Sequence, residues 1–266
     1  CRCPGWSFEL EDMDFAKSFS VFNSVPSFAP KGKSSLGQSE QFKAFRSTFA
    51  LRQLAVDLND GEWRFYDGGP KNTPVLLCLP GACGTAESFY RTMLHLCPKG
   101  YRIVAAQHPA YYTINDFVLG MDAFLDALEA PDVHLLGAAL GGLLAQQYAI
   151  ARPKRVASMI LCNSFYSNSS FEPAAGTMVT SMYQMTPYFV LKNMLLTSFN
   201  NDAAAISASP EVSEAVDFVV EQLNSLSQEH LASRLTLNCS PCQCIGLKMA
   251  QENITIMDAL DRQARP

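Results

Sequence analysis

Apolar runs alternate with amphipathic segments through the middle of the chain. Four of the apolar runs have the length of strands: 74–80, 101–106, 133–138 and 156–163. Three segments between them have helical spacing: 86–97, 116–128 and 140–151. Near-continuous apolar character is typical of strands that are buried on both faces of a parallel sheet. The alternation therefore predicts an α/β fold with a doubly wound, mostly parallel sheet.

The regions on either side of this alternation predict the remaining organisation. Residues 54–58 and 63–67 flank an Asn-Asp-Gly turn and predict a β-hairpin. Residues 178–199 and 211–234 have helical spacing, and 254–258 returns as a strand. The domains we expect are a flexible N-terminal extension at 1–42, the first part of the core at 43–164, a helical cap insertion at 165–238 and the returning core at 239–266.

A tight turn with glycines follows the strand at 133–138. Gly137-Ala138-Ala139-Leu140-Gly141 matches the Gly-x-Ser-x-Gly nucleophile elbow of an α/β-hydrolase, except that Ala139 stands where the serine belongs. Gly137 and Gly141 suit a turn in which strand and helix crowd each other. An alanine has neither oxygen nor sulfur, so Ala139 cannot attack a carbonyl carbon. The pattern keeps the elbow and removes its nucleophile.

The other parts of a catalytic triad are incomplete as well. The acid position falls on Asp261, which is equally well explained as a solvated loop residue. A base should follow the acid, but the histidines are His95, His108, His134 and His230. Of these, only His108 follows a strand at the end where α/β sites form. Pro266 lies eight residues beyond the last predicted strand, so we expect the fold to be truncated before its last strand and helix.

Backbone groups at the elbow do not depend on the missing serine. The N–H groups of Leu140 and Ala82 occupy the positions of an oxyanion hole, which can hold a carbonyl or carboxylate without turning it over. Cys83 and Ser164 are the alternative nucleophiles, but neither lies at the elbow tip or has an identified base, which favours structural roles.

Several segments resemble the maspardin family of intracellular α/β-hydrolase-like proteins. They are Phe65-Tyr66-Asp67-Gly68-Gly69-Pro70, Gly100-Tyr101-Arg102-Ile103-Val104, His134-Leu135-Leu136-Gly137-Ala138, Leu161-Cys162-Asn163-Ser164-Phe165 and Leu231-Ala232-Ser233-Arg234-Leu235-Thr236-Leu237-Asn238-Cys239. The resemblance covers roughly 45–261 and omits the N-terminal extension. It implies a cytosolic or endosome-associated protein that binds other proteins. Members usually keep serine at the elbow, and this chain departs from them at Ala139.

Composition narrows the class of partner. A net charge of −5 argues against nucleic acid, and no run of 18 or more residues is apolar enough for a transmembrane segment. The first thirty residues lack the features of a secretory signal, so we expect a cytoplasmic protein whose nine cysteines are reduced. Cys239, Cys242 and Cys244 resemble a metal cluster, but their spacing matches no common zinc motif. We assign no metal and no cofactor.

These observations predict a catalytically inactive α/β-hydrolase-like protein that acts as an intracellular protein-binding adaptor. Its partner surface falls on the cap, where methionines and aromatic residues gather: Met182, Tyr183, Met185, Tyr188 and Phe189. The same residues also fit the apolar underside of a cap. The alternatives are an active esterase or lipase with a non-standard nucleophile, and a small-molecule receptor that uses the old pocket.

Overall fold

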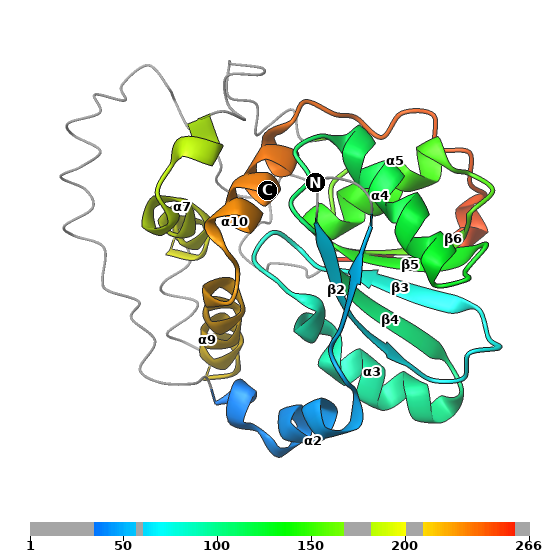
Figure 1. Ribbon diagram of the computed structural model, residues 1–266, viewed down its shortest axis with the longest axis horizontal. Coiled ribbons are helices and arrows are strands. Elements are labelled where there is room, and N and C mark those ends of the chain that lie inside the picture. The colour runs from blue at the N-terminus through cyan, green and yellow to red at the C-terminus, as the bar shows by residue number, and fades with distance from the viewer. Residues whose placement is uncertain (1–34, 57–60, 168–181, 201–209, 259–266) are drawn as a thin grey trace, which may run out of the picture.

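The computed structural model describes residues 35–56, 61–167, 182–200 and 210–258. Within these ranges, seven strands form a sheet in the order β1-β2-β4-β3-β5-β6-β7 (Figure 1). The strands are β1 Arg52–Ala55, β2 Glu62–Gly68, β3 Val75–Leu79, β4 Arg102–Gln107, β5 Val133–Ala138, β6 Val156–Cys162 and β7 Ile254–Met257. β2 is antiparallel to β1 and β4, and the other neighbours are parallel. The predicted α/β fold with a mostly parallel sheet is confirmed.

The first two strands form the expected antiparallel pair. Arg52 lies opposite Phe65, and Ala55 lies opposite Glu62. Residues 57–60 of the predicted turn lie outside the described residues. On β2, Trp63 and Phe65 are buried while Arg64 is exposed, the alternation expected for an antiparallel strand with one solvated face.

Helices cover both faces of the sheet (Figure 1). They are α2 Glu40–Thr48, α3 Tyr90–Leu96, α4 Ile114–Ala127 and α5 Leu140–Ala151, with short 3-10 helices at Leu36–Gln38, Ala86–Phe89, Cys97–Lys99 and Gln251–Asn253. α4 and α5 share one core with Leu77, Leu79 and Leu135. α2 and α3 share another with Cys78 and Ile103. Successive side chains of a strand point to opposite faces, so β3 contributes to both cores.

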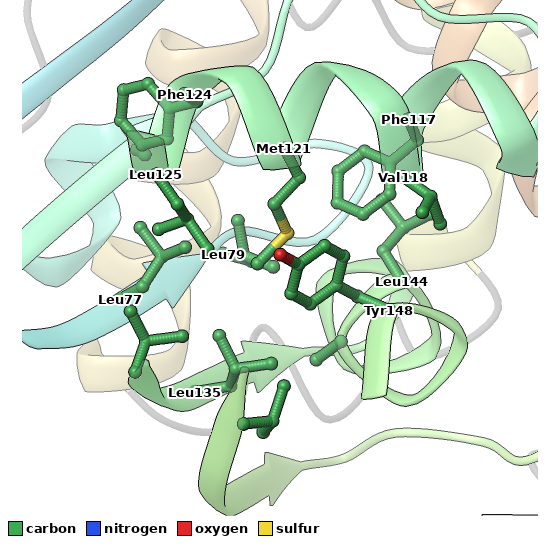
Figure 2. Close-up of a cluster of buried hydrophobic side chains, with 14 of the residues drawn as sticks. Leu77, Leu79, Phe117, Val118, Met121, Phe124, Leu125, Leu135, Leu144 and Tyr148 are labelled. Carbon is green, nitrogen blue, oxygen red and sulfur yellow. The ribbon is translucent and has the colours of Figure 1, made fainter. Parts of the chain in front are cut away.

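The larger core lies between α4 and the central strands. Figure 2 shows Met121 and Phe124 of α4 above the leucines of β3 and β5, with Tyr148 of α5 beside them. All of these side chains are fully buried. Burying one such side chain stabilises the fold by roughly 1.5–3 kcal/mol, so this cluster fixes the strands that lead into the elbow.

Helices between β6 and β7 form a separate cap layer. They are α7 Tyr188–Asn200, α9 Pro210–Asn224 and α10 Gln228–Cys239, which lie together beside the sheet (Figure 1). They enclose a core of their own that includes Leu191, Leu223 and Leu231. The single helix predicted over 211–234 is wrong, because Ser227 caps a new helix by accepting a hydrogen bond from the His230 N–H.

The boundary predicted between 42 and 43 falls inside a helix. Residues 1–34 of the predicted extension lie outside the described residues, but α2 begins at Glu40, after Ser39 caps it. Phe42 is buried against Tyr90 of α3 and Phe218 of α9, with ring centroids 5.2 and 5.4 Å away. These aromatic contacts join the start of the described chain to both the core and the cap.

β7 forms one edge of the described sheet. It pairs in parallel with β6, and its Ile256 and Met257 side chains are more than half exposed.

Among the described residues, none of the helices has the length and apolar character required to cross a bilayer.

Candidate functional site

The elbow is a tight connection between the central strand and the helix that follows it. β5 ends at Ala138, α5 begins at Leu140, and Ala139 alone forms the turn. Ala139 has φ 46° and ψ −113°, a conformation that a residue with a side chain adopts only under strain. A methyl group therefore occupies the position at which this fold holds its nucleophile.

The two flanking glycines are needed for close packing. A Cβ atom on Gly137 would lie 2.5 Å from the Cα of Gly142, and one on Gly141 would lie 2.2 Å from the carbonyl oxygen of Leu79. Both neighbours are backbone atoms, so no side-chain movement relieves the overlap. The structure places both predicted elbow glycines where only glycine fits.

Hydrogen bonds from neighbouring segments hold Ala139 in place. Its N–H donates to the carbonyl oxygen of Cys162 at 3.0 Å, and its own carbonyl oxygen accepts from the Gly142 N–H at 3.0 Å. The Ser164 hydroxyl donates to that same oxygen at 3.1 Å. The elbow is thus fixed by backbone groups and Ser164, and its shape does not depend on the Ala139 side chain.

The loop after β3 lies against the elbow. A Cβ atom on Gly81 would be 3.4 Å from the Cβ of Ala139. Ala82, the next residue, is half-buried and packs against both the main core and the cap core. Leu140 is buried at the first position of α5. These placements bring the loop of Ala82 beside the elbow of Leu140, as an oxyanion hole requires.

His108 is buried rather than free to act as a base. Its ring lies among Trp63, Tyr111 and Phe117, and its Nδ1 donates to the carbonyl oxygen of Pro109 at 2.6 Å. Burial, with a smaller contribution from the charge of Arg234, lowers the pKa of His108 to about 3. Such a ring stays neutral and is a poor proton acceptor at pH 7.

The other triad candidates are not assembled around Ala139. His134 lies near the start of β5, where its Nδ1 is 2.7 Å from the Ser158 hydroxyl. His95 is exposed in the last turn of α3, and burial lowers the pKa of His230 on α10 to about 4. Asp261 lies outside the described residues. The described residues therefore bring no proton-accepting histidine to the elbow.

The alternative nucleophiles are in unreactive surroundings. Burial raises the pKa of the Cys83 thiol to about 11, although the charge of Arg234 opposes this, so Cys83 is a thiol at pH 7. The Ser164 hydroxyl is engaged with the Ala139 carbonyl oxygen and has no hydrogen bond to a histidine. Neither side chain is activated in the way that nucleophilic catalysis requires.

A buried arginine next to this loop was not among the residues predicted from the sequence. Arg234 on α10 is 1% exposed, and its Nη1 donates to the carbonyl oxygens of Ala82, at 2.9 Å, and Gly84. Its Nε and Nη2 are buried, and neither has a hydrogen-bond partner among the residues that the structure describes. Nothing in the pattern of α10 separates this residue from an ordinary exposed arginine. Its only signal is its place within the unusual segment Leu231–Cys239.

Two other features lie away from the elbow. Cys242 and Cys244 are half-buried against the main core, and the Sγ of Cys239 is 3.6 Å from the Tyr183 hydroxyl. No three metal-ligating side chains cluster within the described residues.

A pocket of about 190 Å³ opens at the boundary of core and cap, lined by Tyr112, Gln184, Gln228, Glu229 and Ala232. Neither feature includes Ala139.

Known proteins share this architecture. A family model for the alpha/beta hydrolase fold matches residues 74–251. A hydrolase from Pseudomonas aeruginosa has a similar structure, with a TM-score of 0.58 and 16% identity over 79% of this chain and 90% of its own. An enol-lactonase from Burkholderia xenovorans gives a TM-score of 0.56 and 16% identity over 78% and 91%. Fold and elbow together define a protein of the α/β-hydrolase class.

Sequence relatives specify the family more narrowly. Maspardin from Danio rerio is 40% identical over 231 residues, which cover 85% of this chain and 72% of that protein. Maspardin from Homo sapiens is 40% identical over 230 residues with the same shares. The chain belongs to the maspardin family.

Proposed function

We propose that this protein is a catalytically inactive member of the α/β-hydrolase class that works by binding another protein. The observation that carries the proposal is Ala139, a residue without a nucleophilic atom at the strained tip of a well-formed elbow. Similarity to maspardin supports membership of the same family. The adaptor role and a cytosolic or endosome-associated location are parts of this proposal. We also propose that the backbone N–H groups of Ala82 and Leu140 occupy the positions of an oxyanion hole.

An active hydrolase with a replaced nucleophile is the competing function. The surroundings of Cys83 and Ser164 argue against it, because one is a buried thiol and the other is engaged with the elbow backbone. Labelling the whole protein with a fluorophosphonate and with a chloroacetamide separates the two functions. We expect no labelling of either residue at pH 7.4 in the folded protein, and rapid labelling that denaturation abolishes would support the hydrolase.

The partner surface that we propose lies at the start of the described cap. Met182, Met185 and Phe189 are 51%, 83% and 55% exposed, and they follow one another at three- and four-residue spacing. Met-rich surfaces adapt to a partner because the side chain is flexible and polarizable. Tyr183 and Tyr188, which the sequence also suggested, are buried and half-buried, so they belong to the packing of the cap.

Partner capture with matched variants tests this surface. The triple variant Met182→Ala, Met185→Ala, Phe189→Ala removes the exposed apolar side chains of the cap. The control variant Leu51→Ala, Tyr101→Ala, Leu119→Ala removes three exposed apolar side chains from the surface of the α/β part of the molecule, outside the cap. We expect the cap variant to lose the proteins that the wild type crosslinks and the control to keep them. Identical capture by the wild type and the cap variant would contradict the surface.

A further inference from the structure

Arg234 presents an unused pair of donors inside the protein. A guanidinium carries five N–H bonds, and Nη1 of Arg234 is engaged with the loop carbonyls of Ala82 and Gly84. The remaining nitrogens, Nε and Nη2, lie along one edge of the planar group. Both are buried, and neither has a hydrogen-bond partner within the described parts of the chain. That edge has the spacing that receives two oxygens of a carboxylate side by side.

The charge on Arg234 also lacks an opposite charge among the described residues. No ion pair among the described residues includes Arg234, and the groups that feel its charge most are Cys83, His108 and His230. None of these supplies a negative charge at pH 7, because Cys83 is a thiol and the imidazoles are neutral. Burial lowers the pKa of Arg234 only to about 10, so the guanidinium stays cationic. A buried cation without a partner is costly, and such groups in proteins are normally paired.

We propose that the Nε–Nη2 edge of Arg234 is a binding site for the carboxylate of a small monocarboxylic acid. The site lies where α10 of the cap meets the loop 81–84 of the core, next to the elbow. A carboxylate brings one negative charge and two coplanar oxygens, which match one cation and two parallel donors. A phosphate dianion would leave an excess negative charge in a buried site that holds neutral His108 and His230.

The position of Arg234 connects this site to the elbow. Its Nη1 holds the carbonyl oxygens of the loop whose Gly81 lies against Ala139. Leu231 and Leu235, which lie on either side of Arg234 along α10, belong to the apolar cap core. A ligand at the guanidinium edge would therefore place its apolar chain among cap residues. This carboxylate site is independent of the proposed protein-binding role, because it involves neither a protein partner nor the exposed methionines.

Titration of the whole protein with straight-chain carboxylates tests the site. The probes are acetate, butyrate, hexanoate and octanoate, each compared with the primary amide of the same length and with inorganic phosphate. We expect one carboxylate to raise the Tm by about 5 °C once it exceeds its Kd by roughly a hundredfold. The amides and phosphate should not raise it. No carboxylate effect, or an equal effect of amide or phosphate, would overturn the proposal.

Variants locate the effect at Arg234. Arg234→Met removes both donors at similar volume, Arg234→Lys keeps the charge without the planar edge, and Arg52→Met changes an exposed arginine as a control. We expect Arg234→Met to abolish the shift, Arg234→Lys to weaken the Kd at least tenfold, and the control to bind normally.

A readout on the wild type covers the case in which neither Arg234 variant folds. The ¹⁵N–¹H resonance of a buried arginine Nε should move during the carboxylate titration and stay unchanged with the amide. Stationary Nε resonances throughout the carboxylate titration would overturn the proposal.

Discussion

Ala139 lies at the strained tip of an elbow that keeps its shape without a nucleophilic side chain. A residue other than glycine at φ 46° costs of order 1–3 kcal/mol, and such strain persists only where the surroundings determine the conformation. Here Gly137 and Gly141 allow the close approach, and bonds to Cys162 and Ser164 fix the turn. The elbow is therefore imposed by its neighbours, and we attribute its persistence to the packing of β5 and α5.

Burial of neutral His108 gives the protein a specific dependence on pH. Its pKa is about 3 in the folded state and about 6.5 when unfolded, so the unfolded chain binds more protons between these values. Stability contributed by the neutral ring is complete above pH 6.5 and is lost as the pH falls towards 3, by up to about 1.4 kcal/mol per pH unit. In the variant His108→Asn, whose amide can still donate to Pro109, the part of this dependence that comes from His108 should disappear, while the part that comes from His230, whose pKa is also lowered by burial, should remain.

Urea unfolding between pH 4.5 and 7 measures this difference in slope. His95→Asn, on the exposed end of α3, is the matched control and should keep the wild-type slope. If His108→Asn lost stability with falling pH as steeply as the wild type, His108 would not be buried as a neutral ring.

Sequence reasoning succeeds and fails at single residues for physical reasons. The elbow glycines are readable because only glycine tolerates the contacts at Leu79 and Gly142. Arg234 is not readable, because arginine in a helix is almost always exposed and its burial follows from the loop that packs over α10. Tyr183 fitted either a partner surface or the underside of the cap, and it is buried. The sequence could not decide, since a local pattern does not tell which face of a cap meets the core.

At the scale of elements, one carboxylate joins the cap to the core. Glu87, at the start of the short helix before α3, accepts hydrogen bonds from Arg46 of α2 and from the Tyr66 hydroxyl of β2. Its other oxygen accepts from Gln222 of α9 at 3.1 Å. Gln222 in turn accepts a hydrogen bond from buried Thr85. Four segments that are distant in sequence thus meet at Glu87.

Removal of this carboxylate should loosen the cap. In Glu87→Ala the buried Tyr66 hydroxyl and the Gln222 amide lose their acceptor, and we expect the free energy of unfolding to fall by about 2–4 kcal/mol. Denaturant unfolding measures the loss. Glu40→Ala removes an exposed carboxylate that pairs with Lys43 on the surface of α2 and should leave stability unchanged. Equal stabilities of the two variants would show that Glu87 does not bridge cap and core.

Whether an element can be predicted depends on how far apart in the sequence the residues that determine it lie. The strands and helices of the core were predictable, because their burial imposes local periodicity. The break at Ser227 was missed, because a single capping hydrogen bond begins a second helix within the range 211–234. The start of α2 was missed as well, since the burial of Phe42 depends on Tyr90 and Phe218, which lie far along the chain.

The whole molecule combines a closely packed α/β core with a cap that has its own apolar interior (Figure 1). The core explains why the chain keeps the fold of hydrolases, since Leu77, Leu135 and Met121 contribute to stability whether or not the elbow is active (Figure 2). The alternation of apolar runs and helical segments predicted this fold class but not the boundaries between its parts, because contacts between cap, core and α2 are long-range. The protein therefore retains the fold, and we propose that it has lost turnover.

Ester hydrolysis by the whole protein tests this central claim most directly. A panel of p-nitrophenyl esters with acyl chains of increasing length is compared for the wild type, Ala139→Ser and a buffer blank. We predict that the wild type releases p-nitrophenol at the rate of the blank for every chain length, because Ala139 offers no nucleophile. Activity in Ala139→Ser alone would assign the loss to that one residue. Wild-type turnover above the blank would contradict the account.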